Sequence, residues 1–105
     1  MLPELSAAYV RAFALPCTHW PVPAPGALEA VTAPSASPTL VVGNTGDPVT
    51  PLESAQHVAA TLEHGHLLTY AGTGHTTYGK NHCADAHIDT YLLDLALPPA
   101  STACR

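Results

Sequence analysis

The sequence predicts an α/β fold in which two parallel strands alternate with two helices, in the order β-α-β-α. The stretch 39–43 is apolar on both faces, which is typical of a strand in a parallel sheet covered on both sides. An amphipathic segment at 51–63 follows it, and a second apolar run lies at 66–70. A second helical segment, 84–97, completes the pattern. A right-handed crossover through the first helix makes the two strands parallel.

Both predicted helices have an apolar stripe. In 51–63 the stripe consists of Leu52, Ala55, Val58, Ala59 and Leu62. Pro51 suits the first helical position, and Thr50 is the candidate N-cap. In the second helix we expect four side chains to face the sheet: Ile88, Tyr91, Leu92 and Leu95.

The first third of the chain has a different character. Apolar residues at helical spacing predict an N-terminal helix over 3–15, and the proline-rich stretch 16–38 predicts an irregular connection. Trp20 is expected to anchor this connection by packing on the body of the protein. We therefore expect two parts: residues 1–37 as helix and connecting segment, and residues 38–105 as the α/β domain.

Composition excludes several classes of function. The chain has 105 residues, of which only 10% are charged, and a formal net charge of -5. Its basic residues, Arg11, Lys80 and Arg105, are scattered, so nucleic-acid binding is not expected. No apolar run reaches the roughly 20 residues that cross a bilayer, so no membrane span is expected. The start of the chain lacks the basic region of a signal peptide, and the location of this chain stays unknown.

Seven histidines and three cysteines raise the question of a metal site. None of the paired spacings typical of zinc sites is present, although His87 follows Cys83 by four residues. We therefore expect no metal and no other cofactor, apart from weak adventitious binding of nickel or zinc. The odd cysteine count leaves two interpretations open: one disulfide and one cysteine whose partner lies elsewhere, or three reduced thiols.

Two polar residues follow the two predicted strands. Asp47 lies in Gly-Asp-Pro-Val-Thr-Pro after the first, and His75 lies in Gly-Thr-Gly-His after the second. Since parallel strands end at the same edge of a sheet, we expect their side chains to meet. An imidazole oriented by a carboxylate is the Asp–His part of a Ser-His-Asp triad. For Asp47 alone, a turn in which the carboxylate caps backbone amides is an equally simple interpretation.

The sequence contains no candidate for the nucleophile of such a triad. The chain order in α/β-hydrolases is Ser, Asp, His, with the Ser in a G-x-S-x-G turn. None of the five serines has glycine two positions before and after it: Ser6, Ser35, Ser37, Ser54 and Ser101. We therefore expect the nucleophile in a segment upstream of this chain, and we interpret the chain as the C-terminal fragment of an α/β-hydrolase fold.

The two motifs and their surroundings resemble a known family. Residues 38–104, with GDPVTP and GTGHTTYGKNHC, are similar to the C-terminal domain of tripeptidyl aminopeptidase-like α/β-hydrolases, which are exported serine exopeptidases. The resemblance implies that Asp47 and His75 are triad residues and that Cys83 and Cys104 form a disulfide, leaving Cys17 free. It also implies an extracellular or cell-envelope location for the full-length enzyme. Leu95 departs from the family, which often has glycine there.

These observations favour a chain that supplies the Asp and His of a serine peptidase. We expect its partners to be a missing N-terminal portion that carries the Ser, and a peptide substrate in the complete enzyme. Without a Ser the isolated chain is predicted to be inactive, so whether it is itself an enzyme stays open. The alternative is a non-enzymatic remnant or assembly module that docks on a separately encoded N-terminal half.

Overall fold

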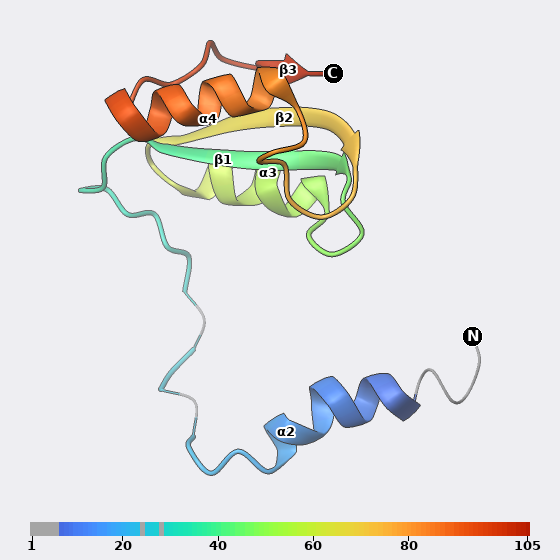
Figure 1. Ribbon diagram of the computed structural model, residues 1–105. Coiled ribbons are helices and arrows are strands. Elements are labelled where there is room, and N and C mark those ends of the chain that lie inside the picture. Colours follow the sequence, from blue (N-terminus) through green and yellow to red (C-terminus); the bar gives the residue numbers. More distant parts are fainter. Residues whose placement is uncertain (1–6, 24, 28) are drawn as a thin grey trace.

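The computed structural model describes residues 7–23, 25–27 and 29–105 and has the α/β architecture expected from the sequence (Figure 1). The body contains β1 (Thr39–Gly46), α3 (Leu52–Thr61), β2 (Gly65–Thr73), α4 (His82–Asp94) and β3 (Ala103–Cys104). The strands form one sheet in the order β1-β2-β3, and both pairings are parallel. This architecture is consistent with the C-terminal part of an α/β-hydrolase fold.

The two helices lie on opposite faces of the sheet, α3 on one and α4 on the other (Figure 1). Gly43 is needed for the close approach of α3, because a Cβ atom there would lie 2.7 Å from Leu52 Cδ1 and 2.8 Å from Ala55 Cβ. β1 and β2 pair in register from Thr39 with Gly65, and the register shifts near their ends, between Asn44 and Gly46. The edge of β1 that faces away from β2 has no partner strand among the described residues.

The buried core lies on the α4 side of the sheet and is small. Among the described residues its fully buried apolar members are Leu68, Ala84 and Cys104. Four partly buried side chains pack around them: Leu40, Val42, Tyr70 and Ile88. The alternation of side chains along a strand explains which strand residues belong to the core, since even-numbered positions of β1 and β2 point to the same face.

The third strand was not predicted. β3 has only two residues and no apolar run, so its pairing with Thr69 and Tyr70 of β2 leaves no periodic signal in the sequence. α4 also ends at Asp94 rather than at residue 97, because Leu95 adopts the left-handed conformation, with φ 55°.

Three side-chain expectations about α3 and α4 were wrong. Thr50 does not cap α3: the N-cap is Pro51, and the Thr50 hydroxyl is instead bonded to Asp47. Leu92 and Leu95 do not face the sheet, with 68% and 56% of their surface exposed. Leu92 lies on the flank of α4 beside the face that buries Ala84 and Ile88, and Leu95 lies beyond the last helical residue.

The N-terminal segment is helical but makes no buried contact. Residues 3–6 of the predicted helix 3–15 lie outside the described residues. Residues 7–9 are α-helical and are followed by a π-helical turn, η1 (Val10–Ala14), and by α2 (Leu15–Thr18). Residues 7–23 are all exposed, and Trp20, expected as an anchor, is 69% exposed. No helix among the described residues is both long and apolar enough to span a membrane.

Candidate active site

Asp47 begins the loop between β1 and α3, where its carboxylate organises the turn. Its Oδ1 accepts hydrogen bonds from the backbone amides of Val49, at 2.8 Å, and Thr50, at 3.0 Å. Its Oδ2 accepts one from the Thr50 hydroxyl, at 2.9 Å. Only 5% of the Asp47 side chain is exposed. Asp47 therefore caps backbone amides, as the turn interpretation predicts.

The same carboxylate also contacts His75, which is 28 residues further along the chain and lies in the loop after β2. Nδ1 of His75 lies 3.1 Å from Asp47 Oδ1 and 3.0 Å from Oδ2. The two loops are joined at the backbone as well, because the amide of Gly74 donates to the carbonyl of Gly46, at 3.0 Å. The expectation that the two side chains meet at the carboxyl edge of the sheet is met, and the turn and the His contact coexist.

Hydrogen bonds to the carboxylate keep Asp47 ionised. The backbone amide of Thr50 has the largest effect in lowering the pKa of Asp47 below its ordinary value of 3.8. The amide of Val49 and the side chains of His75 and Thr50 lower this pKa further, whereas partial desolvation raises it. Because an ionised carboxylate only accepts, Nδ1 of His75 is the donor. In the neutral ring Nε2 then carries a lone pair and can accept a proton.

The opposite side of the His75 ring is open. The side chain is 48% exposed, and Nε2 makes no hydrogen bond with the described residues. A cavity of about 490 Å³ runs from Asp47 and His75 along the unpaired edge of β1. Its lining includes Val41 and Val42 of β1, Ser54 and Val58 of α3, and Ile88 of α4. Ser54 is the one serine in this lining, and it forms no hydrogen bond to His75.

Asn44 fixes the His75 loop and was missed by sequence reasoning. This β1 residue is 3% exposed, and its Nδ2 donates to the carbonyls of Gly74, at 2.9 Å, and Thr76, at 2.8 Å. Its Oδ1 accepts from the hydroxyl of Thr77. The one signal that could have identified it is an amide residue at the end of an otherwise apolar strand.

Lys80 supports the same loop. Its ammonium group donates to the carbonyl of His75 and, at 3.1 Å, to that of Thr76. Thr76 has a φ of 68° and Gly74 a φ of 92°, so the backbone on both sides of His75 is left-handed. Such backbone needs surrounding contacts to hold it, and Asn44 and Lys80 supply them.

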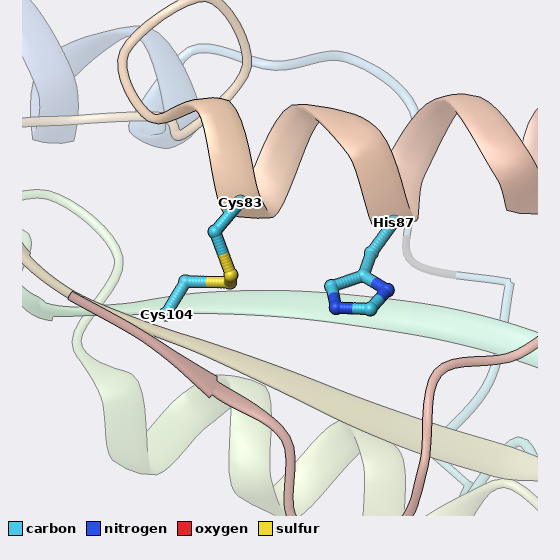
Figure 2. A group of neighbouring side chains, drawn as sticks. All are labelled: Cys83, His87 and Cys104. Atoms are coloured by element: carbon cyan, nitrogen blue, oxygen red, sulfur yellow. A yellow bond between two sulfur atoms is a disulfide. The ribbon is translucent and has the colours of Figure 1, made fainter.

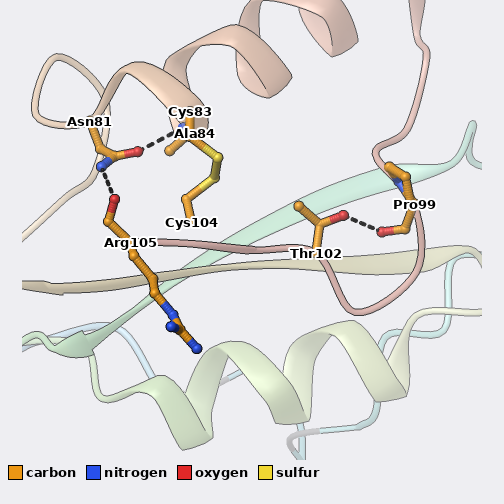
Figure 3. The surroundings of a disulfide bond; sticks show 7 residues. All are labelled: Asn81, Cys83, Ala84, Pro99, Thr102, Cys104 and Arg105. Atoms are coloured by element: carbon orange, nitrogen blue, oxygen red, sulfur yellow. Dashed lines mark hydrogen bonds between the residues drawn. A yellow bond between two sulfur atoms is a disulfide. The ribbon is translucent and has the colours of Figure 1, made fainter.

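The C-terminal tail is attached beside this loop. Cys83 in α4 and Cys104 in β3 form a disulfide with a Cα–Cα distance of 5.7 Å, the pair that the family resemblance implied (Figure 3). Cys17 is free and exposed. Asn81 caps α4 by accepting from the amide of Ala84, at 3.0 Å, and its Nδ2 donates to the carbonyl of Arg105, at 3.1 Å (Figure 3).

Within the part of the chain that the structure describes, three metal-ligand side chains come together, Cys83, His87 and Cys104 (Figure 2). The sequence spacing alone did not indicate this group, because Cys104 is brought to the other two by its pairing with β2.

Comparison with known proteins agrees with this architecture. Residues 3–104 match the family described as TAP-like protein. Serine protease Hip1 of Mycobacterium tuberculosis is 39% identical over 89 residues, and carboxylesterase B of the same organism is 38% identical over 89 residues. Each alignment covers 84% of this chain but only 17% of the relative, so the chain spans about a sixth of the length of these curated relatives. It corresponds to a C-terminal region of serine hydrolases, and it belongs to the TAP-like protein family.

Proposed function

We propose that this chain supplies the Asp and His of a Ser-His-Asp triad that hydrolyses peptide or ester bonds. The observation that carries the proposal is the contact of Asp47 with Nδ1 of His75, which leaves Nε2 without a hydrogen bond to the described residues in a side chain that lines the cavity. The names of the relatives agree on a hydrolase and differ in the bond that is cleaved, which is a peptide bond for a serine protease and an ester bond for a carboxylesterase. We propose the peptidase as the principal activity.

In the proposed reaction, Nε2 of His75 takes the proton of a serine hydroxyl while that oxygen attacks the carbonyl carbon. Asp47 holds the ring in the tautomer that accepts this proton and stabilises the imidazolium that forms. His75 then returns the proton to the leaving amine, and a water molecule repeats the cycle on the acyl-enzyme. The oxyanion is stabilised by backbone amides outside this chain.

The serine of this reaction comes, in our proposal, from a portion of the hydrolase other than these 105 residues. The half-exposed ring of His75 and the cavity beside β1 leave room for a group that approaches from outside the described body. Ser54 is a poor candidate, because it lies in the first turn of α3 and makes no contact with His75. Alone, the chain would not turn over substrate.

A second candidate function is a docking module without catalysis. It is favoured by the unpartnered edge of β1 and by the apolar lining of the adjoining cavity, which together form a surface where another strand could add. The two functions share the first step, attachment to an N-terminal hydrolase portion. They differ in whether His75 then takes part in chemistry.

We further propose the division into residues 1–37 and 38–105. The exposure of all residues in 7–23 supports a connecting role for the first part, and every element of the sheet lies in the second. A chain beginning at residue 38 is therefore expected to keep the contact between Asp47 and His75.

Reconstitution tests the proposed function. The full chain is combined with the N-terminal portion of a TAP-like relative that contains its G-x-S-x-G serine, and hydrolysis of peptidyl amides and esters is measured. We expect turnover by the pair only, and at least about a thousandfold loss of kcat in His75→Ala. Ser54→Ala is the matched control and should leave kcat unchanged.

The outcomes separate the candidates. A pair that forms but hydrolyses neither substrate class supports the docking module. Turnover by this chain alone that disappears in Ser54→Ala would place the nucleophile within it and overturn the proposal.

A further inference from the structure

The group Cys83, His87 and Cys104 has an arrangement that the disulfide alone does not require. Their ligand atoms, two Sγ and one imidazole nitrogen, all lie within 4.8 Å of one another. Cys83 and His87 are four residues apart in α4 and project from one face of it, toward the strand that carries Cys104 (Figure 2). The His87 ring makes no hydrogen bond with the described residues, so both of its nitrogens are available.

Cys104 is held near α4 by contacts other than the disulfide. It pairs with Tyr70 of β2, and the amide of Thr69 donates to the carbonyl of Thr102, at 3.1 Å. The Asn81 side chain holds the carbonyl of Arg105, at 3.1 Å (Figure 3). Reduction of the disulfide therefore leaves two thiols close to His87 rather than releasing the tail.

The chemistry of reduction produces the ligands. A dithiol reductant breaks the Sγ–Sγ bond, so that two electrons and two protons pass to Cys83 and Cys104 and the reductant becomes a cyclic disulfide. The products are two thiols beside a neutral imidazole, the donor set that zinc prefers. In the oxidised chain the same sulfurs are bonded to each other and offer no thiolate.

We propose that the reduced protein binds one zinc ion through Cys83, His87 and Cys104. Binding releases the two thiol protons to solvent, and the two thiolates neutralise the ion, so no net charge enters this half-buried site. Water takes the fourth position. Tetrahedral zinc with bonds of about 2.3 Å places its ligand atoms about 3.7 Å apart. The two sulfurs, which are bonded to each other in the oxidised chain, need to move apart to this spacing, and the sulfur–nitrogen separations, which are at most 4.8 Å, need to shorten by at most about 1 Å. Side-chain rotation after the disulfide opens provides this.

The proposed site would replace one cross-link between α4 and β3 by another. In the oxidised chain the disulfide joins α4 to the tail, and in the reduced chain the metal makes the same connection between the same two residues. The loop that carries His75 enters α4 directly before Cys83, so it would keep its anchor under reducing conditions.

Cobalt titration tests the site, since tetrahedral Co²⁺ bound to thiolate absorbs in the visible and near ultraviolet. The full chain carries Cys17→Ser, which removes the free thiol, and is reduced with a phosphine that takes oxygen from water to become its oxide. We expect saturation at one equivalent of Co²⁺, displacement of that ion by Zn²⁺, and no saturable thiolate band in the oxidised chain.

Variants identify the ligands. His87→Ala should weaken Co²⁺ binding at least about tenfold, whereas His82→Ala, an exposed histidine of the same helix, should not change it. Cys104→Ser removes one of the two thiolates, so the Co²⁺ absorption band that arises from two coordinated thiolates should disappear. Circular dichroism shows whether that variant folds. His87→Ala keeps both cysteines and can be reoxidised, so it tests the site even if Cys104→Ser does not fold.

Three titration results would contradict the proposed zinc site. Equal Co²⁺ affinity in the oxidised chain, or an affinity of the reduced chain unchanged by His87→Ala, would mean an adventitious ion only and would overturn the proposal. A stoichiometry of half an equivalent would assign the thiolates to a contact between two chains and would also overturn it.

Discussion

Asp47 stabilises two structures with one carboxylate. Its oxygens accept from the backbone amides and hydroxyl of its own turn, and also face Nδ1 of His75. Hydrogen bonds to an ionised acceptor are stronger than those to a neutral one, so the turn that aims Asp47 also keeps it charged. The residue that orients the imidazole is itself oriented by backbone.

This arrangement predicts a stability that falls in acid. The folded-state pKa of Asp47 lies below its ordinary value of 3.8, so the unfolded chain takes up a proton first as the pH falls. The contribution of Asp47 is therefore complete above about pH 5 and declines below about pH 4. Thermal melts by circular dichroism from pH 7 to pH 3 should show a smaller loss of Tm in Asp47→Asn than in the unchanged chain. Equal losses would show that Asp47 has no depressed pKa.

At the scale of single elements, β1 does more than form the edge of the sheet. Its last buried side chain, Asn44, holds two carbonyls of the loop that contains His75, and that loop follows β2. Neither carbonyl has another side-chain donor from β1. An apolar residue of the same size would leave both carbonyls without the amide.

Asn44→Leu is therefore expected to lower the free energy of unfolding by about 2 kcal/mol, because the Gly74 carbonyl and the hydroxyl of buried Thr77 lose their Asn44 partner, whereas the Thr76 carbonyl keeps Lys80. Amide hydrogen exchange in residues 74–80 should accelerate more than exchange in β1 and α3. Thr45→Val is the matched control, since Thr45 is the next residue in β1 and is exposed. Uniformly faster exchange across the whole domain would instead show that Asn44 supports the core rather than the loop.

The end of α4 offers a second test at this scale. Leu95 is left-handed, with φ 55°, a conformation that costs a residue with a Cβ about 1 kcal/mol relative to glycine. Leu95→Gly should raise the free energy of unfolding by about 1 kcal/mol, because the exposed side chain loses little packing. Leu95→Ala keeps the Cβ and should change it little. Chemical denaturation of the three proteins decides, and destabilisation by glycine alone would contradict the argument.

The elements that the sequence predicted well are those with periodic apolar patterns. β1, α3, β2 and α4 all appear, within a few residues of the expected ranges. The features that were missed depend on contacts between distant residues. β3 exists because two residues pair with β2, and Thr50 fails as a cap because Asp47 takes its hydroxyl. Asn44 likewise acts on residues 30 and 32 positions away, which no local pattern reveals.

At the scale of the whole molecule, the site depends on the crossover between β1 and β2. The Asp and His motifs were recognisable as segments, and the parallel arrangement predicted that they meet, because both loops leave the sheet at the same edge. What the sequence could not predict was the orientation of the ring, which turns Nδ1 toward Asp47 while the side chain lines the cavity. Asn44 and Lys80 support the loop that holds this ring by donating to its backbone carbonyls.

The small core is the other feature at this scale. Its fully buried apolar members number three among the described residues, while large apolar side chains of α4 and of the N-terminal segment are exposed. The edge of β1 that has no partner strand among the described residues, and the apolar cavity beside it, are further uncovered surfaces. In our account these surfaces are covered by the remainder of the hydrolase, which also brings the serine.

The most direct test of the account is the protonation of the two ring nitrogens of His75 in the folded chain. Nitrogen-15 NMR correlation spectra, recorded at an alkaline pH at which the ring is neutral, report which nitrogen carries the proton. We predict the Nδ1–H form for His75, with a strongly deshielded proton, and a shift toward the Nε2–H form in Asp47→Asn. An Nε2–H ring in the unchanged chain, or a spectrum unaffected by Asp47→Asn, would contradict the pairing on which the proposed triad depends.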